Sequence, residues 1–186
     1  MSGMTKARLT AILAGHPPAP QIFAETGTFY GERAALATEL FNAVYTVELS
    51  PTLYQAARSR YAALPIHFVL GDSREVVPQW ARTIPAPVCW YLDAHWFDLN
   101  RGRTRAGAAR AAAAQVAGAD GLPLWDELAA IATRPYRDII IVDDARDFGT
   151  NAPTVEWESI SLERIAAYFP DHQEAVIVVD QAVVYR

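Results

Sequence analysis

Acidic side chains stand at the ends of successive apolar runs, where they could bind a ligand. They are Glu25, Glu48, Asp72, Asp93 and the pair Asp143–Asp144. A carboxylate can accept two hydrogen bonds from vicinal hydroxyl groups, and it is also a ligand that hard cations prefer. Any one of these acids could instead cap the helix that follows it. Because several acids occupy the same position, at the end of successive apolar runs, we interpret them as the rim of one ligand site.

The first of these acids opens a glycine-containing segment, ETGTFYG, which begins at Glu25. Gly27 and Gly31 permit a tight turn and the close approach of a ligand to the backbone. An ordinary turn between a strand and a helix would show the same glycines. Glu48 favours the ligand interpretation, because it lies 23 positions after Glu25, near the roughly 20-residue offset of a ribose-binding acid.

His95 is the candidate general base. It lies two residues after Asp93, so in an extended segment the two side chains would share one face. An imidazole, with an unperturbed pKa of about 6.5, suits the removal of a proton from a substrate hydroxyl. A histidine that is merely hydrogen-bonded beside a pocket is the alternative. Trp96 could line such a pocket, and Arg146 could pair with the neighbouring acids or hold an anionic substrate.

Five strand-length segments must position these residues, and helix-like segments separate them. The strands are expected at 21–25, 43–48, 66–72, 87–93 and 138–144. The last of these, DIIIVDD, is continuously apolar, which is typical of a parallel strand covered on both faces. Two further segments, EAVIVVD and QAVVYR, predict an antiparallel hairpin with a tight turn at Asp180–Gln181. The pattern predicts an α/β fold: a Rossmann-like, doubly wound, mostly parallel seven-stranded sheet that binds ligands at the carboxyl ends of its strands.

Residues 1–186 are expected to form a single domain. One segment fits this domain poorly: residues 97–121 are rich in Ala, Arg and Gly, and have little apolar surface with which to dock. We interpret them as a mobile lid or partly ordered insertion, with a solvated surface loop as the alternative.

Composition narrows the partners and the compartment. The net charge of −5 argues against a general nucleic-acid binder, which needs a basic surface. No apolar run approaches the roughly 20 residues needed to cross a bilayer. Cys89 is the single cysteine, so no internal disulfide can form, and the region before Gly15 does not resemble a secretory leader. We expect a cytoplasmic protein that acts on a small-molecule acceptor, without nucleic-acid or membrane partners, and with a homodimer as one possible state.

The segments ETGTFYG, VYTVELS, VLGDS and YLDAH together resemble the successive motifs of class I S-adenosylmethionine-dependent methyltransferases. The resemblance implies that the first motif cradles the methionine part of the cofactor, that the acid after the second strand holds the ribose, and that the Gly-Asp pair contacts adenine. The cofactor-binding residues that it implies are Glu25, Thr26, Gly27, Thr28, Tyr30, Gly31, Glu48, Leu49, Gly71, Asp72, Ser73 and Asp93. We expect Glu25, Glu48 and Asp72 to border one cleft shaped for an adenosyl group.

Within that superfamily, YLDAH and IIIVDDAR are similar to small proteins of the macrocin O-methyltransferase group. The similarity implies a divalent metal, Mg²⁺, on Asp93, Asp143 and Asp144, whose carboxylates make a hard oxygen site. The metal would orient the acceptor and lower its pKa, and His95 would receive the proton. Without metal, His95 and Asp93 would share this work. The same aspartates could instead cap helices or bind the cofactor.

The function expected from the resemblance is methylation of a hydroxyl oxygen on a small molecule. A nicotinamide-dependent oxidoreductase is one alternative, because it also uses a glycine turn and a ribose-binding acid, although Thr26-Gly27-Thr28 lacks the paired glycines of that fingerprint. A module that binds S-adenosylmethionine without catalysis is the other, because a fold does not by itself establish an activity.

Overall fold

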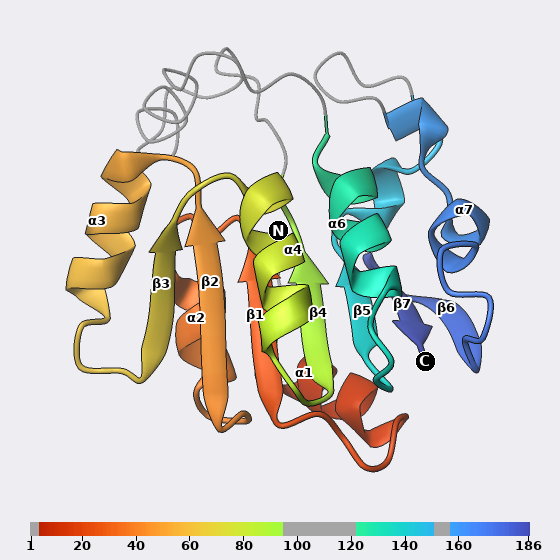
Figure 1. Cartoon of the computed structure of the whole chain (residues 1–186), viewed down its shortest axis with the longest axis horizontal. Coiled ribbons are helices and arrows are strands. Elements are labelled where there is room, and N and C mark those ends of the chain that lie inside the picture. The colour runs from red at the N-terminus through yellow and green to blue at the C-terminus, as the bar shows by residue number, and fades with distance from the viewer. Residues whose placement is uncertain (1–3, 95–121, 151–156) are drawn as a thin grey trace.

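A seven-stranded sheet with the strand order β3-β2-β1-β4-β5-β7-β6 forms the centre of the computed structural model, which describes residues 4–94, 122–150 and 157–186 (Figure 1). The strands are β1 (Ile22–Thr26), β2 (Ala43–Glu48), β3 (Ile66–Leu70), β4 (Val88–Leu92), β5 (Ile139–Val142), β6 (Glu174–Val178) and β7 (Gln181–Tyr185). The helices are α1 (Lys6–Ala14), α2 (Glu32–Ala37), α3 (Pro51–Arg60), α4 (Ser73–Thr83), α6 (Leu124–Ala132) and α7 (Leu162–Ala166), with 3-10 turns at Ala145–Asp147 and Trp157–Ser159.

The strand directions confirm the predicted topology. β1 pairs in parallel with β2 and β4, and the parallel pairing continues to β3 on one side and β5 on the other. β7 is antiparallel to both β5 and β6, so the chain ends in the expected hairpin. The turn of that hairpin is one residue earlier than predicted, because Gln181 already pairs with Val178 within the ladder. The strand order reverses at β1, which is the point where ligands of such sheets bind.

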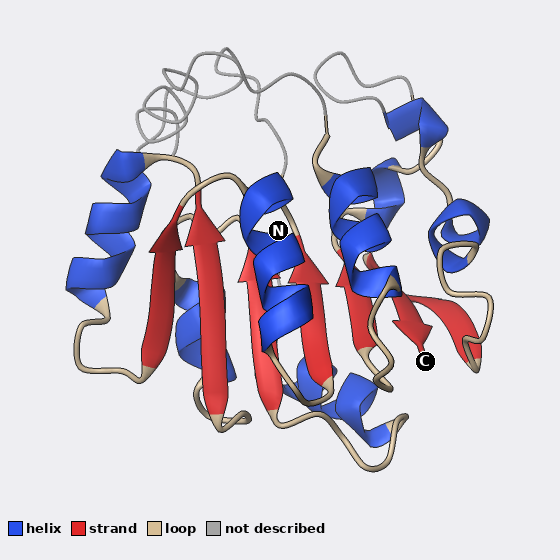
Figure 2. Cartoon of the chain, viewed as in Figure 1, coloured by secondary structure: helices blue, strands red, loops and turns tan. Residues whose placement is uncertain are grey.

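Helices cover both faces of the sheet, with α4, α6 and α7 on one side and α1 and α2 on the other (Figure 2). The pleat of β4 shows why both faces must be covered. Trp90 packs into the cluster beneath α4 and α6, whereas its neighbours Cys89 and Tyr91 pack into the cluster beneath α1 and α2. All five residues of β4 are buried, which explains the continuous apolar run in the sequence.

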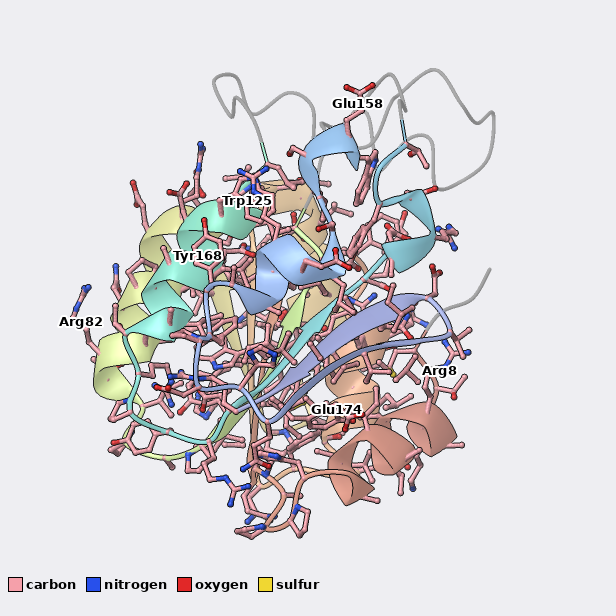
Figure 3. The ribbon with its side chains drawn as sticks, turned by 90° about the vertical axis from the view of Figure 1, so that its right-hand side faces the viewer. Arg8, Arg82, Trp125, Glu158, Tyr168 and Glu174 are labelled. Atoms are coloured by element: carbon pink, nitrogen blue, oxygen red, sulfur yellow. The ribbon has the colours of Figure 1, made fainter. Side chains whose placement is uncertain are left out.

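α7 is short and is joined to α6 by aromatic packing. Tyr168, just after α7, stacks on Trp125 of α6 with the ring centroids 6.0 Å apart, and the two residues are labelled near one another in Figure 3. The guanidinium of Arg164 lies 4.0 Å from the centroid of a Trp125 ring. Among the described residues, no helix has the length and apolar character that a membrane span requires.

Candidate functional site

The carboxyl ends of β1 to β5 gather at one edge of the sheet, at the top of Figure 1, and the loop after β1 crosses that edge. Gly27 adopts a φ of +78°, and a Cβ on it would lie 2.8 Å from the carbonyl oxygen of Asp93. Gly31 has a φ of +81°, and a Cβ there would lie 3.0 Å from the Tyr61 ring. Only glycine fits both positions, because positive φ and close backbone contact each disfavour a side chain.

Glu48, at the end of β2, ties this loop to its own strand. Its Oε2 accepts a hydrogen bond from the amide of Phe29 (2.8 Å), and its Oε1 accepts one from the amide of Ser50 (2.9 Å). Burial raises the pKa of Glu48, and the backbone amides oppose that rise. Each carboxylate oxygen can accept a second hydrogen bond, so Glu48 retains the capacity to bind vicinal hydroxyl groups.

The other predicted cofactor residues near Glu48 lie in the loop after β1 and at the end of β2. The amides of Gly27 and Thr28 donate to the carbonyl of Val47 (3.0 and 3.2 Å), which docks the loop on β2. Tyr30 packs edge-on against Phe29, with the ring centroids 4.5 Å apart. Leu49 directly follows Glu48, and Thr26 accepts a hydrogen bond from the amide of Asp93 (3.3 Å).

Glu25 differs from the expectation, because its side chain is fully buried beneath the loop. Its Oε1 accepts a hydrogen bond from Thr46 (2.8 Å), and its Oε2 lies 3.8 Å from the guanidinium of Arg33. Burial raises the pKa of Glu25 to about 7, outweighing the attraction of Arg33 and the hydrogen bond from Thr46. Glu25 therefore positions Arg33 and the loop rather than forming an open rim.

Asp72 follows the capping alternative. Its carboxylate accepts a hydrogen bond from the amide of Arg74 (2.9 Å) at the start of α4, and the Arg74 guanidinium approaches to 2.6 Å. Hydrogen bonds from Arg74 lower the pKa of Asp72. Gly71 donates its amide to the carbonyl of Glu48 (3.0 Å), and Ser73 is buried in the first turn of α4. The adenine-binding role of Gly71, Asp72 and Ser73 stays a prediction.

Arg33 of α2 joins three of the strand ends, and the sequence analysis missed it. Its Nη2 donates to Asp93 (2.7 Å) and lies 3.5 Å from Asp143, while its Nη1 is 3.8 Å from Glu25. The guanidinium also lies over the ring of Tyr91, 4.0 Å from the centroid. Burial would lower the pKa of Arg33, but the surrounding carboxylates raise it well above its usual range. In the sequence, only the position of Arg33 in the first turn after the glycine loop indicated that it could lie near the site.

The acidic group that could hold a metal differs in part from the predicted one. Asp143, Asp144 and Asp180 each bring a carboxylate oxygen within 4.8 Å of the others, and Asp93 lies outside this group. Arg146 donates to Asp144 (2.7 Å) and to Asp180 (2.6 Å), so it pairs with the local acids as predicted. Three carboxylates suit a hard cation such as Mg²⁺, although Arg146 would have to move to free two of them.

A small, partly open cleft lies between the ends of β4 and β5 and the start of α6. Its lining is mostly apolar and includes three acids: Leu92, Asp93, Ala94, Leu122, Leu124, Glu127, Val142, Asp143 and Trp157. Glu25, Glu48 and Asp72 are absent from this lining, whereas Asp93, another predicted cofactor residue, is part of it. Among the described residues, the first three therefore do not border this cleft.

Glu127 is the second functional residue that the sequence analysis missed. It is 1% exposed, and burial raises its pKa to about 7. A signal was present, because Glu127 falls on the same helical face as the buried Leu124, Leu128 and Ile131. His95 and Trp96 lie outside the described residues, as does the 97–121 segment, so their predicted roles are untested.

Comparisons with known proteins bear on the fold. No family model and no curated protein matches the sequence. Solved structures do match: the O-methyltransferase from Bacillus cereus in complex with S-adenosylhomocysteine is 18% identical, with a TM-score of 0.58 over 96% of this chain and 78% of that one. TomG, an O-methyltransferase from Streptomyces achromogenes in complex with S-adenosylmethionine, is 15% identical, with a TM-score of 0.57 over 95% and 75%.

A methyltransferase from Geobacter sulfurreducens is 11% identical, with a TM-score of 0.59 over 99% of this chain and 79% of that one. The chain spans only 48% of the length of two longer matches, an amino pentose methyltransferase from Micromonospora echinaspora and DesVI from Streptomyces venezuelae, whose TM-scores are 0.46 and 0.48. At these identities the comparisons establish architecture: this chain has the Rossmann-like fold of class I S-adenosylmethionine-dependent methyltransferases.

Proposed function

We propose that this protein is a S-adenosylmethionine-dependent methyltransferase that methylates a hydroxyl oxygen of a small molecule. The observation that carries the proposal is the loop from Gly27 to Gly31, which Glu48 holds by a hydrogen bond and which passes close to the backbone of Asp93 where the strand order reverses. The O-methyltransferases that share the fold carry S-adenosylmethionine or its product in their structures, which supports the choice of cofactor.

The charges around the loop suit a cationic cofactor. Three acids, Glu25, Asp93 and Asp143, surround the guanidinium of Arg33, so this cluster is rich in negative charge. A sulfonium placed there would be stabilised, while Glu48 would accept hydrogen bonds from the ribose. In the reaction the methyl group passes from sulfur to the acceptor oxygen, the acceptor loses its proton, and S-adenosylhomocysteine leaves.

Most of the acceleration in such a transfer comes from alignment of donor and acceptor, which is worth as much as roughly 7 to 11 kcal/mol in favourable cases. The loop would hold the donor, and the cleft between β4 and β5 would hold the acceptor beside it. His95 and Asp93 are the groups we propose for receiving the acceptor proton. Their assignment rests on the YLDAH motif.

Calorimetric titration with S-adenosylhomocysteine tests the cofactor proposal. The wild-type protein should bind with a saturable isotherm, and Glu48→Gln should weaken binding at least tenfold, because an amide cannot accept the two ribose hydrogen bonds equally well. Glu39→Gln is the matched control, since Glu39 is exposed and pairs only with Lys6 (2.7 Å) among the contacts described for it. Absence of binding in the wild type, or saturable binding of NADH instead, would contradict the proposal.

Magnesium assistance is the finer part of the proposal. Asp143, Asp144 and Asp180 would hold the ion, which when bound would supply positive charge that lowers the pKa of an acceptor hydroxyl. Titration with Mg²⁺ alone should show binding that Asp180→Asn weakens and that Arg146→Ala strengthens, because Arg146 competes for the same oxygens. Equal Mg²⁺ affinities in the three proteins would remove the metal from the proposal.

We further propose that the protein acts in the cytoplasm and can form a homodimer. Cys89 is buried in the core, so the fold does not depend on a disulfide.

β6 ends the sheet and leaves an edge on which Ile177 is 47% exposed. Sedimentation velocity should show a dimer that Ile177→Lys disrupts. A monomer at all accessible concentrations would rule the dimer out.

A further inference from the structure

Glu127 occupies a position where the helix pattern calls for an apolar side chain. α6 presents Leu124, Leu128 and Ile131 to the core, and Glu127 lies in the same stripe with 1% of its surface exposed. A carboxyl group in such a place is costly unless it is hydrogen-bonded. The position therefore needs a physical reason beyond helix formation, because a leucine there would pack at no such cost.

The surroundings satisfy only part of this carboxyl group. The hydroxyl groups of Ser73 and Thr26 lie against it and oppose the rise of its pKa that burial causes. Its Oε1 is buried and has no hydrogen-bond partner among the residues that the structure describes. Buried polar atoms in proteins nearly always have a partner, so Glu127 Oε1 is a position at which a donor from outside the described residues can bind.

The cleft between β4 and β5 is where that donor can enter, because Glu127 forms part of its wall. The rest of the cleft lining is mostly apolar and includes Leu92, Val142 and Trp157. The remaining acids of the wall, Asp93 and Asp143, share the guanidinium of Arg33. A bound molecule would therefore meet an apolar surface and an acidic group, a lining that disfavours anions.

We propose that Glu127 determines acceptor specificity by accepting a hydrogen bond from an O–H or N–H group of the acceptor in this cleft. The acceptor class is thus an uncharged or cationic molecule with an apolar body and a donor group, and anionic acceptors are rejected. The proposal rests on the proposed function, because it treats this cleft as the acceptor side of the methyl-transfer site.

Three small probes of matched length test the proposal: 1-butanol, n-butylamine and butyrate. Each is titrated into the full-length protein, with and without saturating S-adenosylhomocysteine, and the Trp157 indole signal is followed by nuclear magnetic resonance. Butanol and butylamine should shift this signal with saturation, and butyrate should bind at least fivefold more weakly. Equal binding of butyrate, or no saturable binding of any probe, would overturn the proposal, and neither outcome requires a variant.

The Glu127→Gln variant tests whether Glu127 causes the weaker binding of butyrate. We expect it to reduce the butylamine-to-butyrate affinity ratio at least fivefold, whereas Asp126→Asn, which removes an exposed carboxylate from the adjacent position, should leave the ratio unchanged. An unchanged ratio in a folded Glu127→Gln protein would overturn the proposal. S-adenosylhomocysteine affinity should stay the same in Asp126→Asn. If the wild type does not bind S-adenosylhomocysteine, the proposed function is contradicted. The probe titrations without cofactor test the role of Glu127 separately.

Discussion

Gly27, just after β1, lies against the backbone of Asp93, just after β4, and this steric role can be separated from backbone freedom. Both Gly27 and Gly149 adopt positive φ, at +78° and +72°. A Cβ on Gly27 would lie 2.8 Å from the carbonyl oxygen of Asp93, whereas a Cβ on Gly149 would meet no atom of the described residues within 4 Å. The two glycines therefore share the conformational strain of a substitution but not the steric contact.

We expect Gly149→Ala to lower the free energy of unfolding by about 1 kcal/mol, which is the usual penalty for a left-handed alanine. Gly27→Ala should lower it by roughly 2 to 4 kcal/mol, because the loop must also move away from Asp93. It should in addition weaken binding of S-adenosylhomocysteine. Urea unfolding and calorimetry measure the two effects. Equal losses of stability in the two variants would show that the contact with Asp93 is unimportant.

At the scale of elements, α2 is joined to the sheet edge by one cation. Arg33 reaches Asp93 after β4, Asp143 after β5 and Glu25 in β1. Its side chain is 20% exposed, so the interactions are only partly screened by solvent. Removing one partner from a largely buried ionic cluster leaves like charges together, which is usually more damaging than the pair was stabilising.

We expect Arg33→Met to lower the free energy of unfolding by roughly 2 to 3 kcal/mol at pH 8. The loss should be smaller at pH 5.5, where protonation of Glu25, whose pKa is raised to about 7, relieves the repulsion. Arg33→Lys should recover part of the loss. The control is Arg60→Met, because Arg60 pairs with Glu32 at an exposed site and should change stability little. A loss that is the same at both pH values would contradict this account.

For the molecule as a whole, the buried glutamates Glu25, Glu48 and Glu127, whose pKa values burial raises, make stability depend on pH. Burial raises the pKa of both Glu25 and Glu127 from 4.5 to about 7. Between these values the folded protein binds more protons than the unfolded chain, so each group makes the free energy of unfolding fall as pH rises. The buried His16, whose pKa is lowered by burial, acts in the opposite sense below its usual pKa. The difference in the free energy of unfolding between the wild type and a variant of one glutamate isolates the contribution of that glutamate.

The stability of wild type relative to Glu127→Gln should therefore fall by roughly 2 kcal/mol between pH 5 and pH 8, since one pKa unit corresponds to about 1.4 kcal/mol. Urea unfolding at several pH values measures this difference. Asp126→Asn should show no comparable trend, because Asp126 is exposed. A constant difference between wild type and Glu127→Gln over this range would mean that Glu127 is ionised in the folded protein.

The amino-acid sequence by itself determined the architecture. Apolar runs of strand length, alternating with helical segments, predicted the parallel strands and the closing hairpin, because burial of both faces of a sheet is encoded by local periodicity. Gly27 and Gly31 predicted the tight loop after β1, and both have the positive φ that glycine permits. The misplaced hairpin turn, off by one residue, shows the usual limit of such patterns at element ends.

Only the tertiary structure decided which charges meet. Arg33 contacts Asp93 and Asp143, which lie 60 and 110 positions away in the chain, and no local pattern records such a pairing. For the same reason the sequence did not predict that Asp180 lies with Asp143 and Asp144. Periodicity specifies what each segment buries, whereas the electrostatics of a site depends on distances between segments that folding alone brings together.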